Sequence, residues 1–293
     1  MRERVAVVGP GAVGATVAAY LHRAGHPLVL CGRTPRDRLD VRPDGADPIV
    51  VPGPVLTDPG DVAGPVPLVM LAVKATQLNE AAARWLRVLC DEHTTVCVLQ
   101  NGVEQVELVQ PLCPRSTVVP AIVWLGAETQ PDGWVRLRGE PRLTVPASAS
   151  VVHVLRESGF VVTAASDFTT EAWRKLLVNA LAGFMVLAGR RSGMFRRDDV
   201  AALARRYLAE CLTVARAEGA HLGAEVIDEM ASMFGQAPED VGTSMLFDRE
   251  ARRPLEWDIR NGVILRRARQ HGLAAPISEV IVPLLAAASD GPG

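Results

Sequence analysis

The sequence predicts an α/β protein in which a doubly wound parallel sheet over residues 1–167 precedes an all-helical domain over residues 168–293. Three observations lead to this prediction. A glycine-rich turn joins the first strand-like run to the first helical run, short apolar runs then alternate with helical patterns, and helical spacing dominates after Asp167. Strands separated by helices are typical of a parallel sheet with helices on both faces.

The first half of the chain supplies the elements of this sheet. Residues 5–8 are apolar and end at Gly9, which predicts a buried strand. The helical pattern of residues 13–24 ends at Gly25, a residue type that commonly follows a helix. Further strands are expected at residues 27–31, 67–73, 95–99 and 160–163, and further helices at residues 75–89 and 151–158.

Two stretches of the first half depart from this alternation. Residues 45–67 are rich in Pro and Gly, which favours an irregular excursion before the third strand. Residues 118–146 contain runs with valine and tryptophan around a turn signal at 131–133, and they predict a β-meander. In the second half, a helical bundle is expected with breaks at 189–193, 219–223, 235–238 and 272–276.

Charge and cysteine content exclude several classes of protein. The 293 residues include 31 basic and 33 acidic side chains, and the net charge of -2 disfavours nucleic-acid binding. The longest nearly uncharged helical stretch, residues 176–189, is too short to span a bilayer. No secretory segment is visible, and the five scattered cysteines form no C-x-x-C pair. We therefore expect a cytoplasmic protein with reduced thiols, no metal site and no membrane partner.

A glycine motif lies between the first strand and the first helix. G-x-G-x-x-G in this context is typical of a turn that binds a dinucleotide. Its first glycine permits the tight turn, the second lets the backbone approach a pyrophosphate, and the third lets the helix pack on the sheet. The expected cofactor-binding residues are Gly9, Pro10, Gly11, Ala12, Val13 and Gly14. The alternative is a glycine-rich turn that binds no ligand.

The end of the second strand indicates which dinucleotide is bound. An NAD site has an acidic residue about 20 positions after the motif, which accepts from the ribose 2′-hydroxyl. Here Arg33 stands nineteen residues after Gly14. Because a guanidinium binds a 2′-phosphate through two hydrogen bonds, we predict NADP(H) as the cofactor. The alternative, which Asp37 supports, is that Arg33 and its neighbours only cover a solvated loop.

Lysine is rare in this chain. Lys74 and Lys175 are the only lysines, so 29 of the 31 basic residues are arginine. Arginine stays charged at any accessible pH, whereas a lysine ammonium can release a proton. Each lysine is therefore a candidate proton donor, and chance retention is the alternative.

Several motifs, spread over nearly the whole chain, resemble those of the ketopantoate reductases (2-dehydropantoate 2-reductases). They are GPGAVG at 9–14, LAVKATQ at 71–77, LQNGV at 99–103, WRKLLVNA at 173–180 and SMLFDREARRPLEWDIRNGVI at 244–264. The resemblance implies an N-terminal Rossmann domain that binds NADP, a helical C-terminal domain, and an active site in the cleft between them. It also implies reduction of ketopantoate to (R)-pantoate with NADPH, on the way to pantothenate and coenzyme A.

The resemblance assigns roles position by position. It implies that Lys175 and Glu256 are catalytic, and that Asn101, Asn179 and Ser244 bind the substrate. Beyond the glycine turn and Arg33, the implied cofactor contacts are Lys74, Asn101, Ala127 and Glu256. The expected partner is a small 2-oxo acid, and a homodimer is the expected assembly, although the sequence does not reveal the oligomeric state.

The chemistry of ketone reduction agrees with Lys175 and Asn179. Hydride adds to carbon and a proton to oxygen, where negative charge develops. The two residues are four apart in a helical run, so their N–H groups can point at the same oxygen. Partial dehydration lowers the lysine pKa from ~10.4, whereas a carboxylate such as Glu256 raises it and orients the ammonium. The alternative is a surface lysine beside Arg174 and Glu171.

Structural alternatives exist for the other positions as well. Asn101 before a glycine is typical of a left-handed turn residue, and Lys74 could be a simple charge at a strand end.

Ser244 is a candidate N-cap for a helix that begins at Met245. The amino terminus of a helix is also suited to bind a substrate carboxylate. Glu256 is a candidate partner for an ion pair with Arg252 or Arg253.

The chain departs from the family pattern at two positions. Polar residues are expected at 183 and 193, where this sequence has Gly183 and Gly193. A substrate group left unpaired costs about 1–3 kcal/mol, and glycine within a helix costs about 1 kcal/mol relative to alanine. Our hypothesis is that Gly183 opens room for a bulkier or differently substituted 2-oxo acid. The alternative is that water or another side chain replaces the lost groups.

Two further functions stay as alternatives. A 3-hydroxy acid dehydrogenase of the 6-phosphogluconate type shares the domain plan and a Lys/Asn pair, but the segment SMLFDREARRPLEWD is unexpected in it. A non-catalytic NADPH-binding sensor has no use for Lys175, Asn179 and Glu256 together.

Overall fold

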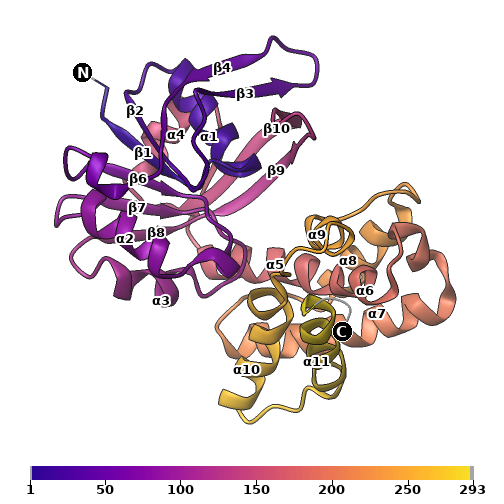
Figure 1. Ribbon diagram of the computed structural model, residues 1–293. Helices are drawn as coiled ribbons and strands as arrows, with labels where there is room; N and C mark the ends of the chain where they lie inside the picture. Colours follow the sequence, from indigo (N-terminus) through magenta and orange to yellow (C-terminus); the bar gives the residue numbers. More distant parts are fainter. Residues whose placement is uncertain (1, 291–293) are drawn as a thin grey trace. The chain divides into compact units, whose positions relative to one another are not determined.

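The computed structural model describes residues 2–290, and the chain divides into two compact units, Met1–Phe168 and Thr169–Gly293. The first unit contains two sheets and the helices packed on them. The second unit consists of helices over its described residues 169–290 (Figure 1). The predicted α/β class with a helical second part is confirmed.

The first sheet has six parallel strands in the order β5-β2-β1-β6-β7-β8. Their bounds are β1 (Val5–Val8), β2 (Leu28–Cys31), β5 (Val55–Leu56), β6 (Leu68–Leu71), β7 (Thr95–Val98) and β8 (Thr117–Pro120). The order runs outward from β1 to β5 on one side and from β6 to β8 on the other. Ligands of such doubly wound sheets bind where the order reverses, outside the carboxyl ends of the strands.

Strand β1 shows why this sheet is buried on both faces. Val5 and Val7 belong to one apolar core, while Ala6 and Val8 belong to a second core, because successive side chains of a strand point to opposite faces. Helix α1 contributes to the first core and α2 to the second. The helices of this unit are α1 (Ala12–Arg23), α2 (Glu80–Leu89), α3 (Gln105–Val109) and α4 (Val151–Glu157).

A second sheet in the same unit differs from the sequence prediction. It has the order β11-β10-β3-β4, and β9 pairs with β10 off this path. Its strands are β3 (Arg38–Pro43), β4 (Ile49–Pro52), β9 (Ile122–Thr129), β10 (Val135–Pro146) and β11 (Val161–Ala165). The irregular excursion expected over 45–67 is partly wrong, because it contains two strands: β4 pairs antiparallel with β3, β5 pairs parallel with β2, and Val51 and Val55 join the first core.

The β-meander expected over 118–146 is also only partly correct. Strands β9 and β10 form the predicted antiparallel pair around the turn at Gly133, whose φ is 85°. Strand β8, however, pairs in parallel with β7 in the first sheet. The short, valine-rich run of β8 fits either sheet by its pattern, so its partner depends on tertiary packing.

The helix expected over 75–89 begins later than predicted. A short 3-10 helix, η2 (Ala75–Gln77), comes first, and α2 then starts after Asn79. The Asn79 side chain accepts a hydrogen bond from the Ala81 amide at 3.0 Å, which is the usual arrangement of an N-cap. Lys74 thus lies before the 3-10 helix rather than at the start of a long α-helix.

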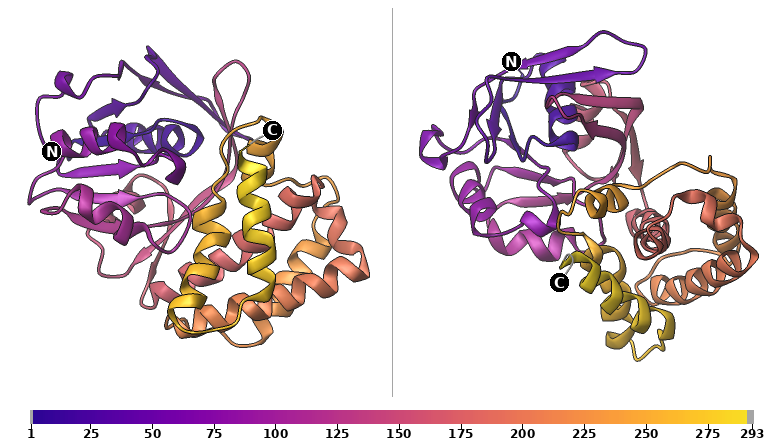
Figure 2. Two further views of the ribbon diagram at one scale, coloured as in Figure 1. Left: turned by 60° about the horizontal axis from the view of Figure 1, so that its bottom comes forward. Right: turned by 45° about the vertical axis from the view of Figure 1, so that its right-hand side comes forward.

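The helical unit has the expected breaks and a further one after α9, at residues 251–256. Its helices are α5 (Phe168–Leu181), α6 (Gly183–Ala188), α7 (Asp198–Ala217), α8 (Glu225–Gln236), α9 (Ser244–Glu250), α10 (Val263–Gln270) and α11 (Pro276–Ser289), with a 3-10 helix η4 (Ser192–Arg196) and a π-helical turn η5 (Asp258–Gly262). Helices α10 and α11 lie side by side (Figure 2). The π-helical turn has no signal in the sequence, and such turns often occur at functional sites.

Residues 2–290 contain neither a membrane-spanning helix nor a candidate metal cluster. No helix of this described part is long and apolar enough to cross a membrane. The same residues contain no cluster of three or more His, Cys, Asp or Glu side chains suited to a metal ion. All five cysteines are free thiols, and four of them are buried.

Candidate functional site

The glycine turn at the end of β1 is shaped by close backbone approaches. Gly9 has φ 89°, and a Cβ atom there would lie 2.8 Å from the backbone nitrogen of Val73. A Cβ atom at Gly14 would lie 2.2 Å from the carbonyl oxygen of Gly9. At Gly11, by contrast, no described atom lies within 4 Å of the position that a Cβ would take. Gly9 and Gly14 are thus required by the fold, while Gly11 faces open space.

The same turn leads into the amino terminus of α1. Gly11 is the N-cap residue, no described side chain caps the helix, and its first turn contains no acidic residue. The amides of this turn therefore offer partial positive charge to an anion. A Cβ atom at Gly32 would lie 3.1 Å from Cδ of Pro10, so the loop after β2 also lies close to the turn.

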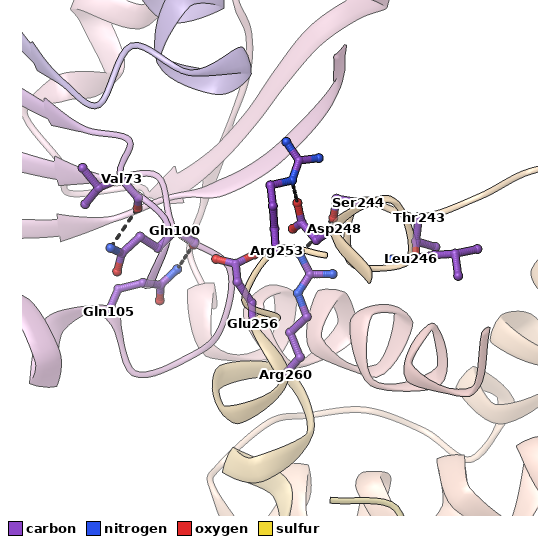
Figure 3. A network of polar contacts seen from close by, with 10 residues as sticks. All are labelled: Val73, Gln100, Gln105, Thr243, Ser244, Leu246, Asp248, Arg253, Glu256 and Arg260. Atoms are coloured by element: carbon purple, nitrogen blue, oxygen red, sulfur yellow. Dashed lines mark hydrogen bonds and ion pairs between the residues drawn. The ribbon is translucent and has the colours of Figure 1, made fainter. Parts of the chain in front are cut away.

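Two neighbouring strands end at this edge of the sheet. Gln100, which follows β7, donates from Nε2 to the carbonyl oxygen of Val73 at 3.0 Å (Figure 3). Gln105 donates to the carbonyl oxygen of Gln100, also at 3.0 Å. Both glutamine side chains are buried. These bonds hold together the chain segments that carry Lys74 and Asn101.

Sequence reasoning missed both glutamines, although they flank Asn101 in the chain. It was also wrong about the turn alternative for Asn101. The residue with positive φ is Gly102, at 103°, and Asn101 is not in the left-handed region. Glycine rather than asparagine therefore provides the unusual backbone conformation of this loop.

Arg33 and Ala127 belong to other segments of the first unit. Arg33 is exposed and follows β2 after Gly32. Ala127 belongs to β9 of the second sheet, where it pairs with Leu137.

Helix α5 carries the two candidate residues of the second unit. Lys175 and Asn179 are one turn apart, and Asn179 is buried while Lys175 is half-buried. Burial is the main reason that the pKa of Lys175 falls to about 8, and the positive charge of Arg260 lowers it further. An ammonium with this pKa is mostly charged at neutral pH and releases its proton more readily than an exposed lysine.

A buried arginine connects two further candidates. Arg260, which sequence reasoning missed, donates from Nη2 to Glu256 Oε2 at 3.0 Å and to Ser244 Oγ at 3.1 Å (Figure 3). Arg260 and Glu256 are 2% and 6% exposed, so their ion pair is shielded from water. A charged residue four positions after Glu256 was the available signal, but it did not reveal that the pair is buried.

The structural alternatives given above for Ser244 and Glu256 name the wrong cap and the wrong partner. The N-cap of α9 is Thr243, whose Oγ1 accepts from the Leu246 amide at 3.4 Å, and Ser244 is the first helical residue. The partner of Glu256 is Arg260 instead of Arg252 or Arg253.

Arg253 pairs instead with Asp248, at 3.0 Å.

The glycine at position 183 is explained by a neighbour from the π-helical turn. A Cβ atom there would lie 2.9 Å from Nδ2 of Asn261. Asn261 is fully buried and donates to the Ala180 carbonyl oxygen at 2.9 Å and to the Tyr207 hydroxyl at 3.0 Å. The idea that Gly183 opens room for substrate is therefore wrong, since the Asn261 amide fills that space.

Gly193 lies elsewhere, in η4, where a Cβ atom would be 3.1 Å from Cβ of Glu239. The space beside Gly193 is thus also occupied by a side chain of this protein, that of Glu239.

A Rossmann-type sheet with a glycine turn after its first strand is typical of dinucleotide-dependent oxidoreductases, and here a helical unit with a half-buried lysine follows it. Two family profiles match this chain: "Ketopantoate reductase PanE/ApbA" over residues 5–150 and "Ketopantoate reductase PanE/ApbA C terminal" over residues 167–289. The chain belongs to the ketopantoate reductase family, and it is an oxidoreductase that acts on CH–OH groups.

Individual relatives agree with this family. The 2-dehydropantoate 2-reductase of Mycobacterium tuberculosis is 68% identical over 100% of both chains, and that of Caulobacter vibrioides is 35% identical over 97% of this chain and 99% of its own. A solved structure of dimeric ketopantoate reductase from Staphylococcus aureus has a TM-score of 0.88 at 26% identity and covers 99% of this chain and 100% of its own. D-mandelate dehydrogenase with NADH and anilino(oxo)acetate shares the fold, with a TM-score of 0.86 at 23% identity and 98% coverage of both chains.

Proposed function

We propose that this enzyme reduces a 2-oxo acid with NADPH, by default 2-dehydropantoate to (R)-pantoate for the synthesis of pantothenate and coenzyme A. The observation that carries the substrate is the 68% identity, over the full length of both chains, with a 2-dehydropantoate 2-reductase. The 6-phosphogluconate type of dehydrogenase and the NADPH sensor have no comparable support.

The first unit fits a dinucleotide. The open side of Gly11 and the uncapped amides of α1 would hold the pyrophosphate, with Lys74 and Asn101 at the neighbouring strand ends. Arg33 would bind the 2′-phosphate of NADP, and the backbone of Ala127 is a further candidate contact. When bound, the cofactor supplies the hydride.

In the second unit, Lys175 would give a proton to the carbonyl oxygen of the substrate. Its lowered pKa, about 8, makes this transfer easier while the amine stays mostly protonated at neutral pH. The amide of Asn179, one helical turn further, would donate a hydrogen bond to the same oxygen as it gains negative charge.

The remaining candidates would hold the substrate and the amine. Ser244 and Asn101 offer uncharged hydrogen-bonding groups for the substrate carboxylate and hydroxyl. Glu256, held by Arg260, would orient the ammonium of Lys175. With these roles, residues 1–167 would form the NADP-binding domain and residues 168–293 would form the catalytic domain.

An assembly and a location are also part of this proposal. We infer a homodimer, because the Staphylococcus aureus relative is described as dimeric. The cytoplasm is the proposed location, since all five cysteines are free thiols, as is typical of a reducing compartment.

A panel of 2-oxo acids, assayed by the loss of NADPH absorbance, tests the function. We expect 2-dehydropantoate to have the highest kcat/KM, and NADPH to have a lower KM than NADH. A higher kcat/KM for another 2-oxo acid would contradict the substrate, and a preference for NADH would contradict the role of Arg33.

A further inference from the structure

Arg260 is a buried charge to which the sequence assigns no role. Its side chain is 2% exposed, and its Nη2 atom contacts both Glu256 and Ser244. Its Nε atom has no hydrogen-bond partner among the described residues. A buried arginine is tolerated only when an opposite charge and hydrogen bonds compensate for the lost water, and Glu256 provides that charge.

The contact with Arg260 determines what Ser244 can do. A guanidinium has only N–H donors, so the Ser244 oxygen must accept in this bond. The hydroxyl hydrogen of Ser244 is then directed to another acceptor. Ser244 is exposed, whereas Arg260 is buried, so the serine presents this donor at the surface of its unit.

One nitrogen serves both contacts, so the two partners are coupled. Glu256 precedes the π-helical turn and Arg260 lies within it, four residues later. Any movement of the guanidinium changes the position of the Glu256 carboxylate and of the Ser244 hydroxyl together.

The charge of Arg260 also reaches Lys175. After burial, it is the second cause that lowers the pKa of this lysine to about 8. The charged residues next to these two have other partners: Arg174 on α5 pairs with Glu229 on α8 at 2.6 Å, and Asp258 pairs with Arg266 at 2.9 Å.

We propose that Arg260 is a positioning residue for the reduction: it fixes Glu256 and makes Ser244 a hydrogen-bond donor to the carboxylate of the 2-oxo acid. This inference rests on the function proposed above. A charge-assisted bond to the serine oxygen polarises its hydroxyl, which strengthens donation to an anion. Ser244 touches the substrate in this arrangement, and Arg260 acts through it.

The first test compares Arg260→Met with Arg266→Met, which removes an arginine from an exposed ion pair of the next helix. We expect Arg260→Met to raise the KM for 2-dehydropantoate by about tenfold or more, because a hydrogen bond to a charged group is lost. The KM for NADPH should stay unchanged, and Arg266→Met should resemble the unsubstituted enzyme in both constants. An unchanged KM for 2-dehydropantoate in folded Arg260→Met would overturn the proposal.

A double-mutant cycle tests whether Arg260 acts through Ser244. In a Ser244→Ala background, Arg260→Met should raise the KM for 2-dehydropantoate no further, since the hydroxyl that it positions is gone. Independent, multiplying effects would overturn the proposed route.

Arg260→Lys keeps a positive charge beside Glu256, so it provides a folded variant if Arg260→Met does not fold. The lysine side chain is one bond shorter than that of arginine, so its ammonium does not reach Oγ of Ser244 and Oε2 of Glu256 together, and we expect the KM for 2-dehydropantoate to stay raised. The decline of kcat at high pH should remain near pH 8 in Arg260→Lys and move upward in Arg260→Met, because only the latter removes the charge that acts on Lys175.

A KM for 2-dehydropantoate in Arg260→Lys equal to that of the unsubstituted enzyme would overturn the positioning role. Turnover of 2-dehydropantoate by the unsubstituted enzyme shows whether the inference about Arg260 or the proposed function is wrong. If it reduces 2-dehydropantoate normally and the Arg260 variants do too, only the inference about Arg260 is wrong. If it does not turn over 2-dehydropantoate with NADPH, the proposed function is wrong and the inference falls with it.

Discussion

Lys175 is the residue on which the proposed chemistry depends most. Replacing it with alanine removes the proton donor but leaves the glycine turn of the first unit untouched. We therefore expect Lys175→Ala to lower kcat by about 10²–10⁴-fold, the range of general acid catalysis, with little change in NADPH affinity. Stopped-flow turnover and NADPH fluorescence titration measure the two effects.

The neighbouring Arg174 provides the control for this variant. It lies on the same helix and forms an exposed ion pair with Glu229, so Arg174→Ala should keep kcat within a few fold. Near-normal turnover of Lys175→Ala would remove the lysine from the mechanism.

The same residue sets the expected pH dependence. Reduction requires the protonated amine, and the pKa of Lys175 is lowered to about 8. The kcat for reduction should therefore be level below pH 8 and fall about tenfold per pH unit above it. Oxidation of pantoate requires the neutral amine, so its kcat should rise with pH up to the same value. A pH profile measured in both directions checks this, and a decline of reduction only near pH 10 would contradict it.

The glycine turn and the helix that follows it form the element that holds the cofactor. Gly14→Ala should lower Tm, because its methyl group would lie 2.2 Å from a backbone oxygen and overpacking costs about 1–3 kcal/mol. Gly11→Ala should leave Tm unchanged, since it faces open space, yet weaken NADPH binding by filling the approach of the pyrophosphate. Calorimetry of the free and NADPH-bound protein separates these effects. Equal loss of Tm in both variants would contradict this division of roles.

The close approach of Gly183 in α6 to Asn261 in the π-helical turn allows a second test at the scale of elements. Gly183→Ala should lower the free energy of unfolding by about 1–3 kcal/mol, because the new methyl group displaces the Asn261 amide, which donates two hydrogen bonds. Gly235→Ala in α8 is a suitable control, since the nearest described atom to its Cβ position is 4.0 Å away. Urea titration of both variants gives the comparison. A stable Gly183→Ala enzyme with altered 2-oxo acid preference would restore the idea that this glycine shapes the substrate site.

At the scale of the whole molecule, the sequence predicted what depends on short-range patterns. The strand before Gly9, the helix after it and the helical second part follow from apolar spacing and glycine positions. The second sheet was largely missed, because the pairing of β3 with β10 joins residues about a hundred positions apart. Periodicity does not identify such partners.

The candidate residues depend on two kinds of signal. Lys175 was singled out by the rarity of lysine, and the family resemblance assigned a role to it and to Asn179, four residues later. Arg260 was missed because its importance comes from burial and from contacts with Ser244, sixteen residues earlier. Asn261 was missed for a similar reason, since it lies over a glycine 78 positions before it in the chain. The assigned roles of the two domains and of the site residues remain predictions.

The position of β10 has a consequence for the order in which a growing chain can acquire its structure. This strand pairs in parallel with β3 through Val135–Leu137 and with β11 through Arg142–Pro146. The hairpin of β3 and β4 therefore leaves the ribosome long before its main partner exists. The second sheet can therefore form completely only after nearly all residues of the amino-terminal unit have been synthesised. Until translation passes β11, the apolar face of the hairpin stays exposed and can aggregate unless another protein covers it.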